Sequence, residues 1–406
     1  MFAAAVLLFV RSMPGAEVLV ARDLSPFASL DAAVRDLPVS STRSYASVAK
    51  GLAAVAKTPL ERSRAAYVWT TEHIAYSLDK HRDATAALAD LTGDCDAHAA
   101  VYASLCKALG VECVTIAGRV RFAVPPGTGL SGYSKPLAEG QWLVAHAWNA
   151  VRIDGGWGLV DATMGGGSSP KNGTNAPADD YFLPDPAVVA TDHVPNDVQW
   201  NLTTAPTDLA RTPVLRPLSW RMGMSPDTLS ADARRDAAQI VLRPKLPWRK
   251  GLRASLQTES ASLPDRVLLQ PTPDGVELRL CPPGPPSLVW LGLNVEGVWR
   301  PLAGYPVTGP VAGRLPKVMT RFYDSGASLA GPYEKVIAAG KPAEIRLRAP
   351  GAEQVVAFQG DDLAGRFVRE GEFWVLRTAP LKGLLEVMAS YEDPGKFQGL
   401  LTYEVR

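Results

Sequence analysis

The stretch HAWNAVRIDGGWGLVDATMGGG, residues 146–167, decides the fold of the first half of the chain. Two short runs rich in β-branched and aromatic residues flank Asp154 and Gly155. An Asp-Gly pair in that setting is the strongest short signal for a β-hairpin with a two-residue turn. Such a turn pairs Ile153 with Gly156 and fixes the register of both strands.

The same register places three side chains of the hairpin together. Continued along the strands, it sets Trp148 opposite Asp161. His146 lies two residues before Trp148, so it shares a face with Asp161 and is diagonal to it. A histidine and a carboxylate are therefore expected within hydrogen-bonding reach.

A second stretch, GDCDAHAAVYASLCKALG at residues 93–110, begins a predicted helix. Cys95 lies at its start between Asp94 and Asp96, and Gly110 fits a C-terminal cap. A helix N-terminus favours a thiolate, whereas two flanking carboxylates oppose it unless they cap the helix or face solvent. The predicted apolar stripe consists of Tyr102, Leu105, Cys106 and Leu109.

Together these stretches supply the parts of a Cys-His-Asp triad. Cys95 is the candidate nucleophile, His146 the base that takes its proton, and Asp161 the residue that fixes the imidazole. The backbone N–H of Cys95 is a candidate oxyanion donor. Each residue alone has an ordinary structural interpretation, and only their joint occurrence indicates chemistry.

Composition excludes several classes of function. The net charge of +1 gives no basic surface for nucleic acid. The four cysteines show no CxxC spacing, and the five histidines form no HExxH pair, so neither a metal nor another cofactor is expected. No segment is long and apolar enough to span a membrane.

The N-terminus allows two interpretations. Residues 1–21, MFAAAVLLFVRSMPGAEVLVA, fit either a signal peptide cleaved after Ala21 or a buried strand or helix. The first would make the protein secreted or periplasmic, and the second cytoplasmic.

The rest of the chain indicates an α+β protein with three domains. A capping box at Thr58, Pro59 and Glu61 starts a helix whose apolar stripe would reach Ile74 and Leu78. Beyond about residue 206 the pattern changes to short alternating strands typical of β-sandwiches. The predicted parts are listed by residue number: an N-terminal segment at 1–43, a catalytic domain at 44–205, and two β-sandwich domains at 206–310 and 311–406.

The two quoted stretches resemble the core of the transglutaminase-like superfamily of papain-like cysteine enzymes. The segment YFLPDPAVVATDHVPNDVQWNL, residues 181–202, is similar to the one that follows the triad in the kyphoscoliosis peptidase branch. The segment from Arg321 to the end is similar to that branch's C-terminal β modules, which implies immunoglobulin-like β-sandwiches. On this resemblance Cys95, His146 and Asp161 match the family's nucleophile, base and third member.

The resemblance implies an amide hydrolase, a peptidase or isopeptidase, that works through a thioester. The alternatives are acyl transfer to amines and a non-catalytic scaffold that binds a protein partner through its β-sandwiches. Where the branch usually has Gly and Tyr, this chain has Ala97 and His98. His98, one helical turn after Cys95, is therefore a candidate accessory residue. Trp148, opposite Asp161 in the predicted hairpin, is a second one. The loops at 124–141 and 165–180 are the expected walls of the site, and His193 is interpreted as structural.

Overall fold

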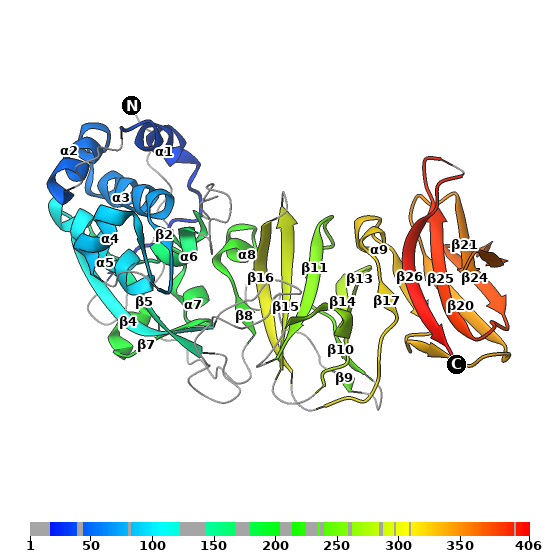
Figure 1. Ribbon diagram of the computed structural model, residues 1–406. Coiled ribbons are helices and arrows are strands. Elements are labelled where there is room, and N and C mark those ends of the chain that lie inside the picture. Colours follow the sequence, from blue (N-terminus) through cyan, green and yellow to red (C-terminus); the bar gives the residue numbers. More distant parts are fainter. Residues whose placement is uncertain are drawn as a thin grey trace. The chain divides into compact units, whose positions relative to one another are not determined.

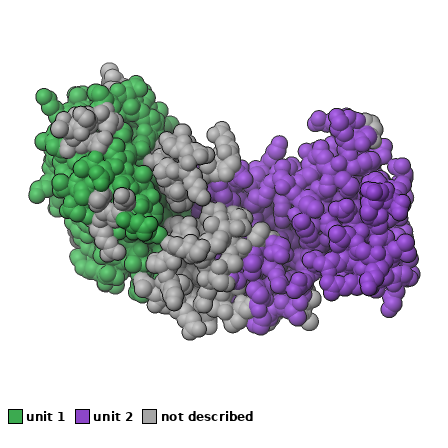
Figure 2. Space-filling model, viewed as in Figure 1, with its two compact units in different colours: residues 1–122, 134–209, 214–223 green, residues 123–133, 210–213, 224–406 purple. Residues whose placement is uncertain are grey.

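The chain forms two compact units (Figure 2). Each unit has its own hydrophobic core. Unit 1 comprises residues 1–122, 134–209 and 214–223, and unit 2 comprises residues 123–133, 210–213 and 224–406. The computed structural model describes residues 17–38, 44–79, 83–121, 143–166, 179–203, 213–224, 234–235, 239–258, 262–283, 287–295, 298–307, 310–393 and 395–406. Within these ranges no helix has the length and hydropathy needed to cross a membrane. The predicted bounds of the three domains stay predictions.

Unit 1 is built from helices packed on a mixed β-sheet, shown blue to green in Figure 1. The helices are α1 (Ala28–Arg35), α2 (Tyr45–Val55), α3 (Pro59–His73), α4 (Ala84–Asp90), α5 (Cys95–Ala108), α6 (Ala162–Gly166), α7 (Pro186–Val189) and α8 (Pro217–Arg221), with the 3-10 turns η1 (Ser25–Phe27), η2 (Asp179–Tyr181) and η3 (Val198–Asn201). The strands are β1 (Glu17–Val18), β2 (Ala75–Tyr76), β3 (Thr92–Gly93), β4 (Glu112–Arg121), β5 (Leu143–Ile153), β6 (Gly156–Val160), β7 (His193–Pro195) and β8 (Val214–Leu215).

The main sheet of unit 1 has the order β1-β6-β5-β4-β7. The predicted hairpin is confirmed: β5 and β6 pair antiparallel with Ile153 opposite Gly156. The turn residues Asp154 and Gly155 have φ values of 50° and 90°, as a two-residue turn of this type requires. Helix α5 lies against β4 and β5, and α3 packs on α5, so the sheet and two helices form successive layers (Figure 1).

The helix signals of the sequence are largely confirmed. Thr58 caps α3 in a capping box with Glu61, and Gly110, with φ of 73°, follows the end of α5. The apolar stripe predicted on α5 is buried. The stripe predicted on α3 is wrong at its far end: the helix ends at His73, and Leu78 is 53% exposed beyond it.

The first described residues belong to the core of unit 1. Glu17 and Val18 form β1, which runs parallel to β6, and Leu19 to Ala21 are buried. For residues 17–21 the structure agrees with the interpretation as a buried strand. Residues 1–16 lie outside the described ranges. Helix α1 is fixed to α3 by a buried ion pair of Asp31 with Arg64, at 2.6 Å.

The described strands of unit 2 form mainly antiparallel sheets, with β19 and β26 as a parallel pair. The sheets build two β-sandwiches, which confirms the predicted fold class. In the first, the sheet β13-β14-β10-β9 faces strands β12, β11, β15 and β16. In the second, the sheet β17-β26-β25-β21-β22 faces the sheet β18-β20-β24-β23, and β19 joins β26.

The described elements of unit 2 are β9 (Arg234–Arg235), β10 (Ile240–Leu242), β11 (Leu252–Gln257), β12 (Ser262–Leu263), η5 (Pro264–Arg266), β13 (Val267–Thr272), β14 (Gly275–Leu280), β15 (Ser287–Val295), β16 (Val298–Val307), β17 (Lys317–Val318), α9 (Thr320–Asp324), β18 (Ser328–Gly331), β19 (Val336–Ile337), β20 (Ala343–Arg348), β21 (Gln354–Gln359), β22 (Asp362–Arg366), β23 (Val368–Glu370), β24 (Phe373–Thr378), β25 (Gly383–Ser390) and β26 (Gln398–Val405).

Candidate active site

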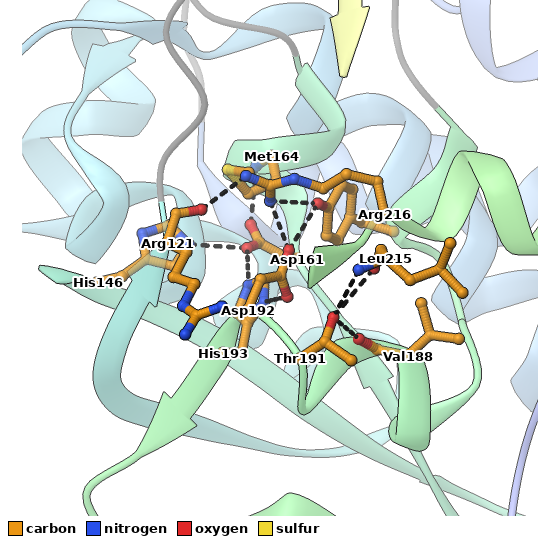
Figure 3. Close-up of polar contacts among 11 residues, drawn as sticks. Arg121, His146, Asp161, Met164, Val188, Thr191, Asp192, His193, Leu215 and Arg216 are labelled. Carbon is orange, nitrogen blue, oxygen red and sulfur yellow. Dashed lines mark hydrogen bonds and ion pairs between the residues drawn. The ribbon is translucent and has the colours of Figure 1, made fainter. Parts of the chain in front are cut away.

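The hairpin brings His146 and Asp161 into direct contact. The Nε2 atom of His146 lies 2.7 Å from the Oδ2 atom of Asp161, and both side chains are buried (Figure 3). The contact follows from the register, because β5 carries His146 to a position diagonal to Asp161, the residue that directly follows β6. The Nε2–H group donates to the carboxylate, which leaves Nδ1 as the ring atom for a nucleophile.

Asp161 is held by the helix that follows it. Its Oδ1 atom accepts a hydrogen bond of 2.8 Å from the backbone N–H of Met164, in the first turn of α6. A carboxylate at this position satisfies a helix N–H group and interacts favourably with the helix dipole. The capping interpretation and the triad interpretation of Asp161 therefore coexist, since the two oxygens serve different partners.

The charges of His146 and Asp161 shift the pKa values of both side chains. Burial lowers the pKa of His146, but the charge of Asp161, its hydrogen bond and a hydrogen bond with Cys95 raise it to about 10. Burial raises the pKa of Asp161, but the charge of His146 and the hydrogen bonds from two imidazoles outweigh it and hold the pKa below its usual range. The pair is thus an imidazolium and a carboxylate at neutral pH.

Cys95 is the first residue of α5 and is partly exposed, whereas Cys106 and Cys281 are buried. Asp94 is the N-cap: its side chain accepts from the N–H of Ala97 at 3.1 Å. Asp96 is exposed. The two flanking acids therefore act as a cap and a solvent-facing side chain, which is the arrangement that interferes least with a thiolate.

A buried amide connects the helix of Cys95 to the strand of His146. Asn149, on β5, donates from Nδ2 to the carbonyl oxygen of Ala99 in α5, at 3.1 Å. The same nitrogen lies 3.3 Å from the hydroxyl of Thr115 on β4. These contacts fix the helix relative to the sheet, and so the thiol relative to the imidazole.

His98 is occupied by backbone groups. Its Nδ1 lies 2.8 Å from the carbonyl oxygen of Asp94 and its Nε2 lies 2.9 Å from that of Ile74. Burial lowers the pKa of His98 against the opposing effect of these two carbonyls. Both ring nitrogens thus face main-chain oxygens, and the neutral ring donates to one of them, so His98 is held in the first turn of α5. Its predicted accessory role stays a prediction.

Trp148 packs against the imidazoles. Its ring is stacked on His146 with centroids 6.0 Å apart and meets His193 edge-on at 5.0 Å. The ring needs the space beside Gly118, where an added Cβ would lie 2.5 Å from the Trp148 Cη2 atom. Trp148 therefore restricts how the histidine rings can tilt.

His193, which the sequence indicated only as a structural residue, contacts the carboxylate of Asp161. Its Nε2 lies 3.0 Å from Oδ2 of Asp161, and its Nδ1 lies 2.5 Å from Oδ1 of Asp192 (Figure 3). The adjacent Asp192 and His193 are the only part of this cluster that the sequence shows directly. No sequence pattern predicts that β7 pairs with β4 and so brings His193 to Asp161.

His146, Asp161 and His193 also have the composition of a metal site. Their nearest nitrogen and oxygen atoms lie within 4.8 Å of one another. Both Nε2 atoms already point at one carboxylate oxygen at hydrogen-bonding distance, and all three residues are buried. A metal would need these atoms turned to a common centre, so the group fits a hydrogen-bonded network better than a metal centre.

The predicted walls of the site lie largely outside the described residues. This applies to the loop at 124–141 and to the part of the 165–180 loop between residues 167 and 178. All four cysteines are described, and each is a free thiol.

Comparison with known proteins finds relatives of part of this chain. Residues 46–162 match the profile of the "Transglutaminase-like superfamily". Mouse and human kyphoscoliosis peptidase are 33% and 32% identical to the chain over 198 residues, covering 46% of the chain and 28% of each relative. The match thus spans less than a third of these relatives' own length. A crystal structure of red sea bream transglutaminase aligns over 98% of this chain and 76% of that one at 9% identity, with a TM-score of 0.25, too low to support any argument.

Proposed function

We propose that the protein is a cysteine-dependent amide hydrolase acting on a protein or peptide. This proposal is supported by the match of residues 46–162 to the transglutaminase-like superfamily and by the similarity of the chain to the kyphoscoliosis peptidases. The superfamily itself supports a papain-like cysteine enzyme or a scaffold of the same fold. The observation that carries the finer proposal is the 2.7 Å contact of His146 Nε2 with Asp161 Oδ2. Cys95 lies near enough to the His146 ring to contribute to its raised pKa.

The proposed reaction starts from a thiolate and an imidazolium. Cys95 Sγ attacks the carbonyl carbon of the amide, and the oxygen becomes an oxyanion that the Cys95 N–H at the start of α5 stabilises. The His146 imidazolium then gives its Nδ1 proton to the leaving nitrogen. The C–N bond breaks, an amine leaves, and the acyl group remains on Cys95 as a thioester.

Hydrolysis returns the enzyme to its starting state. Neutral His146 takes a proton from water, the hydroxide oxygen attacks the thioester carbon, and the C–S bond breaks to give a carboxylic acid and the thiolate. Asp161 keeps its charge throughout and stabilises each imidazolium. A primary amine in place of water would give acyl transfer instead, since it attacks the same carbon.

One experiment separates the alternatives. The full chain and its Cys95→Ala variant are incubated with unfolded casein and a biotinylated primary amine, and the products are followed by mass spectrometry. The proposal expects shortened peptides that depend on Cys95. Incorporation of biotin without cleavage would replace hydrolysis by acyl transfer, and identical product patterns for both chains would contradict an enzyme and favour the scaffold.

A further inference from the structure

His193 lies between two carboxylates. Its Nε2 points at Asp161 and its Nδ1 at Asp192, at 3.0 and 2.5 Å. The side chain is buried, so water does not compete for either nitrogen. The arrangement places a second imidazole on the same oxygen of Asp161 that His146 contacts.

Asp192 is held from its other side by a buried arginine. Arg216 Nη1 pairs with Asp192 Oδ2 and donates to the hydroxyl of Tyr181 at 2.9 Å. Arg216 Nη2 donates to the carbonyl oxygen of Arg121 at 2.6 Å. A chain of contacts therefore runs from His146 through Asp161, His193 and Asp192 to Arg216 (Figure 3).

The chemistry of the acceptors determines the protonation of His193. An ionised carboxylate can only accept hydrogen bonds, so two nitrogens that face two carboxylates must both donate. An imidazole that donates from both nitrogens carries a positive charge. Burial lowers the pKa of His193, but the charge of Asp192 and the hydrogen bonds to both carboxylates raise it above its ordinary value.

We propose that His193 is a positioning residue for the triad: as an imidazolium bridging Asp161 and Asp192, it holds Asp161 on His146 and restrains the basicity of His146. This inference rests on the proposed function, because it assigns His193 a part in the same reaction. His193 touches neither the thiol nor a substrate in this account and acts through Asp161.

The charges around His193 explain both halves of the proposal. The groups that face it are Asp161 and Asp192, the His146 ring 5.7 Å away, and Tyr181 with a ring centroid at 5.8 Å. Asp161 Oδ2 accepts from both imidazoles, so each competes for the same negative charge. A cation that close to His146 opposes the protonation of His146. His193 therefore offsets part of the rise in the pKa of His146 that Asp161 causes.

The charge of His193 can be measured without any substrate. Ring ¹⁵N chemical shifts of histidine-labelled full-length protein, assigned with the His193→Gln variant, distinguish an imidazolium from either neutral tautomer. The proposal expects both His193 nitrogens to be protonated at neutral pH, because the pKa of His193 is raised above its ordinary value. A neutral His193 at about pH 7 would overturn it.

Two variants separate the charge from the hydrogen bond. His193→Gln keeps a donor near the Nε2 position but removes the charge, whereas His193→Asn keeps one near Nδ1 and loses the contact with Asp161. For His193→Gln, the pH profile of Cys95 alkylation by iodoacetamide should shift upward by about one pH unit. For His193→Asn, the rate at the optimum should fall about tenfold or more. His73→Gln, which alters a ring stacked on Trp69, is the matched control with no expected shift.

The outcomes distinguish this inference from the proposed function. A reactive Cys95 whose profile is the same in wild type and His193→Gln would overturn the role of His193 and leave the hydrolase intact. An unreactive Cys95 in wild type would contradict the hydrolase itself. If one of the two His193 variants does not fold, as judged by circular dichroism, the other still assigns the His193 signals, and the wild-type ¹⁵N measurement decides the charge of His193.

Discussion

The contact between His146 and Asp161 allows a quantitative test by the substitution Asp161→Asn. Unit charges 2.7 Å apart attract by about 6 kcal/mol at an effective dielectric constant of about 20. Burial opposes this attraction, and the net result is a His146 pKa raised from 6.5 to about 10. Asparagine keeps the shape of the side chain but removes its charge, so burial should then dominate and the His146 pKa should fall from about 10 to below its ordinary value of 6.5.

The assay is a pH titration of the His146 ring by ¹⁵N NMR in the wild-type protein and in Asp161→Asn. A His146 pKa that stays above about 8 in the variant would refute the reasoning, because another group would then have to hold the proton. A wild-type pKa near the ordinary value would refute it as well. Asp36→Asn, an exchange at the end of α1, is the matched control and should leave the titration unchanged.

The same shift predicts how stability depends on pH. The folded-state pKa of His146 lies above its unfolded value of 6.5. The pair therefore stabilises unit 1 fully below pH 6.5, and this contribution is lost as pH rises through about 10. Urea unfolding should show a loss on the order of 4 kcal/mol over that range in wild type and a much smaller loss in Asp161→Asn. Equal losses in both proteins would contradict the assignment.

Two further predictions concern packing and charge in unit 1, both measured by urea unfolding. Gly118→Ala should lower the free energy of unfolding by about 1–3 kcal/mol, because its Cβ would lie 2.5 Å from the Trp148 ring. Gly51→Ala, with its nearest new contact at 3.7 Å, should raise it by about 0.5–1 kcal/mol, and equal effects would contradict the packing argument. Asp31→Ala leaves buried Arg64 without its carboxylate and should cost about 3–5 kcal/mol. The double change Asp31→Leu with Arg64→Met should cost clearly less, and an equal cost would contradict the ion-pair explanation.

Local sequence signals predicted the parts of the fold that depend on neighbouring residues. The Asp154–Gly155 turn fixes the register of β5 and β6, and the register alone carries His146 to Asp161. The cap at Thr58 is likewise a contact over three residues. The end of α3 was harder to predict, because the apolar spacing continues to Leu78 although the helix stops at His73.

The contacts that the sequence did not reveal join distant segments. His193 reaches Asp161 across 32 positions, and Arg216 reaches Asp192 across 24. Residues this far apart in the sequence are not neighbours on one helix or one strand, so no periodic pattern predicts these two contacts. His98 is a case in which a local pattern indicated a role in catalysis, because it lies one helical turn after Cys95. In the structure its two ring nitrogens face the backbone carbonyl oxygens of Asp94 and Ile74.

The most direct test of the central claim is the relative reactivity of the four thiols. The folded protein is treated with iodoacetamide near neutral pH, and the alkylation of each cysteine is followed by mass spectrometry in wild type and His146→Ala. The account predicts that Cys95 reacts far faster than Cys106, Cys113 and Cys281, and that His146→Ala slows Cys95 alone. Equally slow labelling of all four thiols in the wild type would contradict a catalytic Cys95.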